Sequence, residues 1–355
     1  MTTIDAWAGE ELRISRDATT QAWIVIARHS TRRGPATGGT RVKPYPSVEA
    51  AVTDALRLSE GMTRKNAVAG LPLGGGKAVI AVPVALAPAD RESLLLRYAA
   101  LVEELDGRFI TGPDVGTSES DMDLIGTVTS HVFCRSLAAG GGGTASPWTA
   151  AGVFHGIAAT VRHRLGRVDL AGTSVLVQGL GEVGVPLVDL LVRANARVAV
   201  TDVDAARREA VGARHPGTMI VNPDSVANWI GDVYAPCALG GTLNEGTIRT
   251  LGVSVVAGAA NNQLAEPTDG QRLRERGILY APDFVINGGG IIRAAGKEQL
   301  GWSDAEIDGR IAGIADTLGQ IFTRADASGI TTAEAADQLA AEAMLVPGTP
   351  DRSIA

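Results

Sequence analysis

The sequence is poor in the residues that build disulfide frameworks and metal sites. It contains 2 cysteines and 5 histidines among 355 residues. Cys134 and Cys237 lie far apart and outside any CxxC spacing, and the histidines follow no ligand-like pattern. A disulfide scaffold, a structural zinc site or any other metal centre is therefore not expected. So few thiols are compatible with a reducing, cytoplasmic compartment.

Long hydrophobic runs and an excess of positive charge are also missing. No apolar stretch approaches the roughly 18 residues of a membrane span, and residues 1–10 lack the basic and apolar segments of a signal peptide. The net charge of −7 argues against nucleic acid or an anionic membrane as a partner. The remaining composition, 45% hydrophobic and 20% charged, is typical of a globular chain large enough for two domains.

Glycine is abundant, with 44 residues, but it is not periodic. Its clusters are predicted to be turns where the backbone closely approaches a ligand. The cluster at Gly140–Gly143 is predicted to be either an interdomain hinge or a surface loop. The clusters lie at Gly38–Gly39, Gly74–Gly76, Gly140–Gly143, Gly240–Gly241 and Gly288–Gly290.

The order of predicted elements differs between the two parts of the chain. The first part alternates short apolar runs with two amphipathic segments, of which residues 48–62 form a helix opened by Ser47. From residue 149 onwards, strands and helices alternate regularly, which is typical of a parallel, doubly wound sheet. We therefore predict an α/β protein with two domains separated by a cleft, one of residues 1–145 plus 326–355 and one of residues 146–325. The closing helical stretch, 304–344, is expected to pack back on the first domain.

A glycine-rich loop indicates a dinucleotide site in the second domain. A GxGxxG pattern alone is weak, but this one follows a predicted strand, opens a helix, and is followed by Asp202 at the end of the next strand. The helix N-terminus would bind the phosphates, and Asp202 would accept hydrogen bonds from the ribose and repel a 2′-phosphate, so the site favours NAD over NADP. Glu182 must then point outward. The predicted cofactor residues of this loop and strand are Gly179, Gly181, Glu182, Val183, Gly184 and Asp202.

The first domain carries two lysines and an acid in unusual settings. A lone lysine is usually a solvated surface group. Lys77, however, directly follows three glycines and precedes an apolar strand, so its amine is expected to lie against a pocket. Lys65 stands in Thr63-Arg-Lys65-Asn, and Asp114 follows Gly112-Pro113.

These motifs, taken in order, resemble those of the glutamate, leucine, phenylalanine and valine dehydrogenase family over nearly the whole chain, and most of all its phenylalanine, leucine and valine branch. The resemblance implies a substrate-binding and oligomerising first domain and a Rossmann-type NAD-binding second domain. The motifs are Gly34-Pro-Ala-Thr-Gly-Gly-Thr-Arg41, the Lys65 and Lys77 segments, Gly112-Pro-Asp114-Val, Gly179-Leu-Gly-Glu-Val-Gly184, Ala235-Pro-Cys-Ala238, Gly258-Ala-Ala-Asn-Asn262 and Asn287-Gly-Gly-Gly290.

The resemblance implies NAD-dependent, reversible oxidative deamination of an L-amino acid to a 2-oxo acid and ammonia. Lys77 would be the general base that activates water, with its pKa lowered by desolvation and by the nearby charge of Lys65. Asp114 would relay protons to and from the substrate amine. Lys65 and the N–H groups near Gly38 and Gly39 would bind the substrate carboxylate. The remaining implied contacts, to the substrate or the cofactor, are those of Asn261, Thr149 and Ala238.

The predicted side-chain pocket excludes glutamate as substrate. Glutamate-specific members of the family have a lysine in place of Thr37 and a serine in place of Ala294, without which the distal carboxylate would be buried unpaired. By the same resemblance Gly112 and Ala294 enlarge the pocket, whereas Ile291 fills it. These four residues favour an aromatic or large aliphatic amino acid over valine.

Two other functions remain open at the level of the sequence. A dehydrogenase of 2-hydroxy acids would need a histidine–acid pair, and no histidine stands in a comparable setting. A catalytically silent NAD-binding sensor would be expected to lack Lys77 or Asp114. A homo-oligomer is expected from the resemblance.

Overall fold

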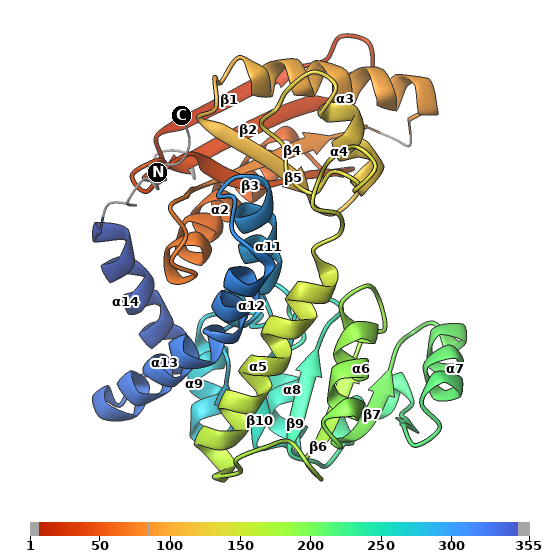
Figure 1. Cartoon of the computed structure of the whole chain (residues 1–355), viewed down its shortest axis with the longest axis vertical. Helices are drawn as coiled ribbons and strands as arrows, with labels where there is room; N and C mark the ends of the chain where they lie inside the picture. The colour runs from red at the N-terminus through yellow and green to blue at the C-terminus, as the bar shows by residue number, and fades with distance from the viewer. Residues whose placement is uncertain (1–6, 84–85, 347–355) are drawn as a thin grey trace. The chain divides into compact units, whose positions relative to one another are not determined.

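A computed structural model describes residues 7–83 and 86–346, and the chain divides into two compact units (Figure 1). The first comprises the described residues up to 144 with 294–302 and 340–346, and the second comprises 145–293 and 303–339. Residues 326–339 and 294–302 thus belong to the opposite units from those expected, because two helices, α11 (Gly289–Glu298) and α14 (Thr332–Leu345), contribute to both. Residues 1–6 and 347–355 of the predicted first domain lie outside the described residues.

The first unit is built on a five-stranded mixed sheet in the order β1-β2-β4-β3-β5. β1 and β2 are antiparallel, as are β2 and β4, whereas β3 pairs in parallel with both β4 and β5. Among the described residues, the helices that lie wholly within this unit are α2 (Val48–Val68), α3 (Pro88–Glu103) and α4 (Glu119–Ile125). The strands are β1 (Glu11–Arg16), β2 (Trp23–Ser30), β3 (Ala36–Lys43), β4 (Gly74–Ala81) and β5 (Phe109–Pro113).

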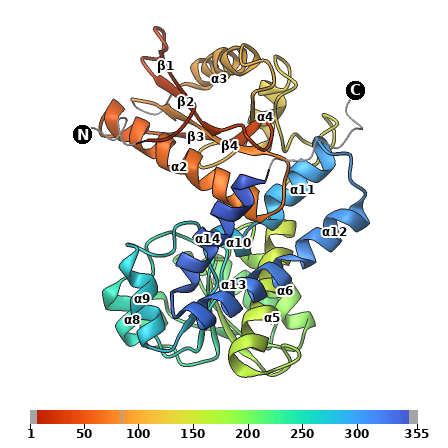
Figure 2. The same cartoon turned by 90° about the vertical axis from the view of Figure 1, so that its left-hand side faces the viewer.

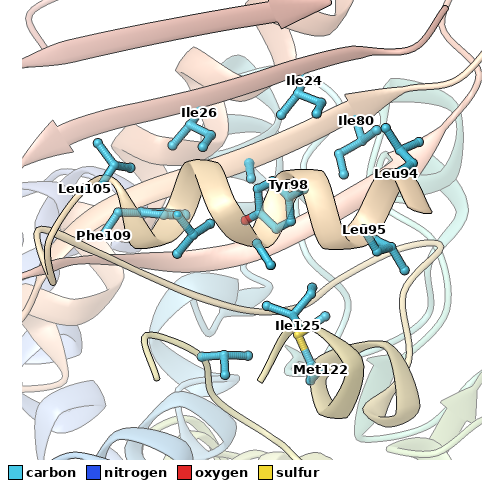
Figure 3. Packing of buried hydrophobic residues seen from close by; sticks show 14 of the residues in the cluster. Ile24, Ile26, Ile80, Leu94, Leu95, Tyr98, Leu105, Phe109, Met122 and Ile125 are labelled. Atoms are coloured by element: carbon cyan, nitrogen blue, oxygen red, sulfur yellow. The ribbon is translucent and has the colours of Figure 1, made fainter. Parts of the chain in front are cut away.

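Helices cover both faces of this sheet, and alternate residues of the strands divide between them. Ile24, Ile26 and Ile80 pack with Tyr98 of α3 in one buried cluster (Figure 3). Val25 and Val79 pack instead with Ala51, Ala55 and Leu56 of α2 in a second cluster. Figure 2 shows α2 and α3 on opposite sides of the sheet. Lys77 shares the parity of Val79 on β4, so it lies on the face that α2 covers.

Two glycine clusters predicted to be turns are strand residues. Gly38 and Gly39 lie within β3, and Gly74–Gly76 open β4. The reason is close packing: a Cβ on Gly75 would lie 2.1 Å from the backbone nitrogen of Thr63 on α2, and a Cβ on Gly38 would lie 1.8 Å from the carbonyl oxygen of Gly76. Glycine here lets a helix and neighbouring backbone come close to the strands, which the sequence pattern alone did not distinguish from a turn.

The second unit contains a six-stranded, wholly parallel sheet in the order β11-β10-β9-β6-β7-β8. The chain order reverses at β6, which has β9 on one side and β7 on the other. In such sheets ligands bind outside the carboxyl ends of the strands at the point of reversal. The strands are β6 (Ser174–Gln178), β7 (Arg197–Thr201), β8 (Met219–Ile220), β9 (Val233–Pro236), β10 (Val255–Val256) and β11 (Leu279–Tyr280).

Helices also cover both faces of this parallel sheet. Leu176, Tyr234 and Val256 pack against Ile248 of α8 and Leu273 of α9 in a buried cluster. Figure 2 shows α5 and α6 on the other side of the sheet. The helical elements are α5 (Ser146–Leu165), α6 (Gly184–Arg193), α7 (Ala205–Arg214), the 3₁₀ turn η1 (Pro223–Asn228), α8 (Glu245–Thr250), α9 (Thr268–Glu275), α10 (Asp283–Ile286), α12 (Asp304–Ala312) and α13 (Ile314–Ser328).

The glycine segment predicted to be a hinge, Gly140–Gly143, directly precedes the division of the chain after residue 144. Glu298 of α11 fastens it within the first unit. The Glu298 carboxylate accepts the backbone N–H of Cys134 at 2.8 Å, and a Cβ on Gly142 would lie 2.8 Å from the same oxygen. Burial raises the pKa of Glu298 despite further N–H donors from this segment. Hinge motion at Gly140–Gly143 remains a prediction.

Candidate active site

The two residues predicted to be catalytic, Lys77 and Asp114, form an ion pair in the first unit. Lys77 is 6% exposed on β4, and its Nζ lies 2.9 Å from Oδ2 of Asp114, the residue that follows β5. Burial lowers the pKa of the Lys77 ammonium, although the attraction of Asp114 opposes this shift. Burial would raise the pKa of Asp114, but the charges of Lys77 and Arg41 lower it to about 2. The pair thus combines an ionised acid with a lysine that loses its proton more readily than usual.

A second cation and a second carboxylate extend this pair, and the sequence analysis assigned no role to either. Arg41 of β3 donates from Nε to Oδ2 of Asp114 at 2.8 Å and from Nη1 to Oδ2 of Asp54 at 2.9 Å. Arg41 is the cation whose charge lowers the pKa of Lys77. The sequence analysis expected Lys65 to have that effect. Arg41 is the last residue of the Gly34–Arg41 motif, but its position in the motif does not reveal which side chains it contacts in the folded chain.

The residues predicted to bind the substrate carboxylate lie near the Lys77–Asp114 pair in the first unit. Lys65 is half-buried near the end of α2, the helix that covers the Lys77 face. Gly38 and Gly39 pair with Thr111 and Gly112 of β5. The ladder from β3 to β4 is interrupted at these two glycines, since it pairs Thr37 with Gly75 and next Thr40 with Ala78. Binding of the substrate carboxylate by these groups remains a prediction.

The four residues predicted to line the side-chain pocket are divided between the two units. Thr37 is buried on β3, and its hydroxyl donates to the carbonyl of Pro35 at 3.2 Å. Gly112 has room around it, because a Cβ there would come no closer than 3.7 Å to Phe133. Ile291 is half-buried and Ala294 is buried on α11, the former assigned to the second unit and the latter to the first. That these residues line one pocket remains a prediction.

The glycine loop of the second unit forms a cradle at the carboxyl ends of β6, β7 and β9. Gly179 has φ +99°, and a Cβ there would lie 2.8 Å from Cβ of Ala238, which follows β9. A Cβ on Gly184 would lie 1.9 Å from the carbonyl oxygen of Gly179. Gly181 has open space, with Nη1 of Arg207 at 4.0 Å from its Cβ position as the closest atom. The structure therefore brings the predicted loop residues together with Ala238, at the N-terminus of α6 where Val183 is the cap.

Two carboxylates border this cradle in different ways. Asp202 is 9% exposed after β7, and it accepts the N–H groups of Leu180 at 2.7 Å and Asp204 at 2.9 Å. Burial would raise the pKa of Asp202, but these hydrogen bonds lower it. Glu182 is exposed and accepts a hydrogen bond from the Ser146 hydroxyl at 3.1 Å. This exposure is in keeping with the outward direction expected of Glu182.

Two further polar residues are oriented by neighbours within the second unit. The Oδ1 atom of the exposed Asn261 accepts from Nδ2 of the buried Asn287 at 2.7 Å, and Asn287 also donates to the Ala259 carbonyl at 3.1 Å. The Thr149 hydroxyl donates to the Ala145 carbonyl at 3.2 Å. A Cβ on Gly290 would lie 2.5 Å from the Thr149 hydroxyl oxygen. Asn287 was quoted as part of a motif, but its orienting role is visible only in the folded chain.

Neither a metal site nor a membrane span is found in the part of the chain that the structure describes. Among residues 7–83 and 86–346, no three His, Cys, Asp or Glu side chains gather in a way that could hold a metal ion. No helix within those ranges combines the length and the apolar character needed to cross a membrane.

A doubly wound parallel sheet with a glycine cradle at its point of reversal defines a nucleotide-binding unit, here joined to a unit that buries a lysine–aspartate pair. Comparison with known proteins places both in one family. Residues 11–131 match the dimerisation domain of Glu/Leu/Phe/Val dehydrogenases, and residues 200–346 match Glutamate/Leucine/Phenylalanine/Valine dehydrogenase. The chain belongs to this family of amino acid dehydrogenases, which are oxidoreductases that use a nicotinamide cofactor.

Three relatives illustrate the similarity. Valine dehydrogenase of Streptomyces coelicolor is 43% identical over 96% of this chain and 93% of its own length. Leucine dehydrogenase of Bacillus subtilis is 41% identical over 94% of this chain and 90% of its own length. The crystal structure of L-tryptophan dehydrogenase from Nostoc punctiforme has a TM-score of 0.83 and 40% identity, and covers 97% of this chain and 98% of that one. The fold class and family predicted from the sequence are confirmed.

Proposed function

We propose that this protein catalyses the reversible, NAD-dependent oxidative deamination of an apolar L-amino acid to its 2-oxo acid and ammonia. The observation that carries the proposal is the buried Lys77–Asp114 pair in a chain that also has a nucleotide cradle. A lysine with a lowered pKa can act as a base near neutral pH, and an aspartate ionised above about pH 2 can receive a proton from an amine.

In this mechanism Lys65 and the backbone at Gly38 and Gly39 bind the substrate carboxylate, and Asp114 takes a proton from the substrate amine. A nicotinamide bound in the second unit would supply the hydride acceptor for Cα of the substrate, whose oxidation would leave an iminium ion. Neutral Lys77 then removes a proton from water as the water attacks the iminium carbon. Asp114 then returns its proton to the amine of the resulting carbinolamine. The C–N bond breaks to release ammonia, and the hydroxyl proton passes to the Asp114 carboxylate as the 2-oxo acid forms.

The residues of the second unit support NAD as the cofactor. The open space at Gly181 and the left-handed backbone at Gly179 suit a pyrophosphate at the N-terminus of α6. The buried carboxylate of Asp202 suits ribose hydroxyls and disfavours a 2′-phosphate. Thr149 would bind the carboxamide of the nicotinamide, and Asn261 would orient the substrate or the nicotinamide ring.

The absence of a cation at Thr37 and the apolar character of Gly112, Ile291 and Ala294 support an apolar substrate. Relatives are named for valine, leucine and tryptophan, which spans the range from branched to aromatic side chains. We propose an aromatic or large aliphatic substrate rather than valine. A homo-oligomer assembled through the first unit is in keeping with the dimerisation domain that residues 11–131 match.

A panel of 2-oxo acids tested with ammonia and NADH, and in parallel with NADPH, examines this proposal. We expect oxidation of NADH with phenylpyruvate, indolepyruvate or 4-methyl-2-oxopentanoate, less with 3-methyl-2-oxobutanoate and none with 2-oxoglutarate. Oxidation of NADH by a 2-oxo acid without ammonia would point to a 2-hydroxy acid dehydrogenase instead. No turnover with any 2-oxo acid, together with tight NADH binding, would point to a sensor.

A further inference from the structure

The two cations beside Asp114 contact the same carboxylate oxygen, Oδ2. Nζ of Lys77 lies 2.9 Å from Oδ2, and Nε of Arg41 donates to the same atom at 2.8 Å. The other oxygen, Oδ1, accepts no hydrogen bond from any residue that the structure describes. One oxygen of this half-buried carboxylate is therefore without a protein donor within the described part of the chain, while the other contacts two cations.

Arg41 is itself fixed from its far side. Its Nη1 donates at 2.9 Å to Oδ2 of Asp54 on α2, an oxygen that also accepts the Tyr45 hydroxyl at 2.6 Å. Arg57 donates to Oδ1 of Asp54 at 3.0 Å. The side chains of Arg41 and Asp54 are 15% and 14% exposed, so little water competes for these bonds. Positive and negative groups therefore alternate from Arg57 through Asp54, Arg41 and Asp114 to Lys77.

This alternation of charges keeps the Asp114 carboxylate paired with a cation when Lys77 loses its proton. If Lys77 were the only cation beside Asp114, loss of its proton would leave a buried carboxylate without a counter-charge, at considerable cost. A guanidinium does not deprotonate in proteins, so Arg41 balances Asp114 whether Lys77 is charged or neutral. The same fixed charge opposes protonation of Lys77, and Asp54 moderates that opposition.

We propose that Arg41 and Asp54 are positioning residues for the deamination: Arg41 holds Asp114 ionised, with Oδ1 free for the proton of the substrate amine, and Asp54 sets how strongly Arg41 disfavours the proton on Lys77. This inference rests on the proposed function of Lys77 and Asp114. It adds a role for two residues outside the predicted set, and it implies that the pH at which Lys77 becomes a base depends on charges that never touch the substrate.

Every element packed against this face contributes titratable groups to it. β3 contributes Arg41, the end of β5 contributes Asp114, and α2 contributes Asp54. The remaining groups are His29 of β2, Lys43 of β3, Tyr45, and Arg57 and Lys65 of α2. Burial lowers the pKa of His29, which favours its neutral form, and its ring nitrogen Nδ1 lies 2.9 Å from the Thr63 hydroxyl oxygen.

Opposite shifts of the pH profile provide the test. Arg41→Met removes a cation, so Lys77 should keep its proton to a higher pH, and the acidic limb of the kcat/KM profile should move up by about one pH unit. Asp54→Asn removes an anion, so the same limb should move down by about half a pH unit. Arg41→Lys, which keeps the charge, should restore most of the shift. A purely structural role would not move the two limbs in opposite directions.

Competitive dinitrophenylation of the substrate-free protein gives a second reading that does not depend on turnover. The pH dependence of labelling at the Lys77 amine, followed by peptide mass spectrometry, should shift in the same two directions. Arg97→Gln is the matched control, because Arg97 also pairs with a buried carboxylate of the first unit, that of Asp17 at 2.5 Å. It should lower the melting temperature and leave both pH profiles unchanged.

Shifts in the same direction, or none, in folded Arg41→Met and Asp54→Asn would overturn the inference while the base role of Lys77 stands. If Arg41→Met does not fold, Asp54→Asn alone decides, since an unchanged or upward-moving limb contradicts the proposal. Full turnover in Lys77→Ala, by contrast, would reject the proposed function of Lys77 and not this inference alone.

Discussion

The two units prepare their sites by different physical means. The first encloses charged side chains that alternate in sign on one face of a sheet: Lys77 is buried, and Asp114, Arg41 and Asp54 are half-buried. The second offers backbone: its glycines leave room, its helix N-terminus offers N–H groups, and Asp202 is held by two N–H donors of its own chain. Charges in a dry environment shift proton equilibria, whereas a glycine cradle excludes side chains and selects by shape. We therefore expect mutations to separate the proposed chemistry of the first unit from the proposed recognition of the cofactor by the second.

The sharpest test of that separation is Lys77→Ala. Turnover should fall by about 10²- to 10⁴-fold, because the base is lost, while NADH should bind with unchanged affinity in a fluorescence titration. Lys297→Ala, at an exposed lysine of α11, is the control and should retain full turnover. Loss of NADH binding in Lys77→Ala would show that the two sites are not independent.

The converse change is Gly184→Ala in the second unit. The added Cβ would lie 1.9 Å from the carbonyl oxygen of Gly179, so the loop must move. We expect a loss of about 2–3 kcal/mol in the free energy of unfolding and at least about tenfold weaker NADH binding, with unchanged labelling of Lys77. Gly309→Ala in α12 is a matched control, since nothing lies within 4 Å of its Cβ position. That variant should gain roughly 0.5–1 kcal/mol.

Gly112→Ala tests whether the first unit, like the second, uses the absence of a side chain at a glycine to make room for a ligand. Its Cβ would make only ordinary contact with Phe133 at 3.7 Å, so stability should change by less than about 0.5 kcal/mol. If Gly112 lines the substrate pocket, the added methyl should lower kcat/KM for the largest 2-oxo acids about tenfold relative to small ones. Unaltered selectivity across the panel would remove Gly112 from the pocket.

The smallest effect is expected for Asn287→Ala. This variant tests whether the second unit prepares its site through an oriented side chain, that of Asn261, in addition to its backbone. Loss of its hydrogen bond would leave Asn261 free to rotate. At about 1 kcal/mol for such a bond, the substrate KM should rise about fivefold, with NADH affinity nearly unchanged. Asn222→Ala, which removes only the cap of η1, should leave KM as it was.

The local parts of both sites could be predicted from the sequence. The GxGxxG loop is contiguous, so its context of strand, helix and Asp202 is visible along the chain. The helix opened by Ser47 was predicted for the same reason, since the cap and the apolar spacing are both local. Lys77 was recognised because three glycines precede it.

Features that depend on tertiary packing could not be predicted in this way. Gly38 and Gly75 were interpreted as turn residues because the approach of α2 and of neighbouring strands to β3 and β4 leaves no trace in the sequence. Arg41 and Asp54 are 13 residues apart and meet only because β3 and α2 share a face of the sheet. The ends of the two units were misplaced because α11 and α14 each serve both.

Helix α11 has a consequence for attempts to redesign selectivity. Its first turns carry Ile291 and Ala294, the predicted pocket positions, and its last turn carries Glu298, which fastens the glycine segment before residue 144. A helix is a stiff rod, so a bulky replacement at Ala294 that tilts it would also displace the Glu298 carboxylate. Libraries that vary residue 294 should therefore keep Glu298 constant. They should also be screened for altered motion of the predicted hinge Gly140–Gly143, since a change in hinge motion can alter turnover in the same way as a change in how the substrate fits its pocket.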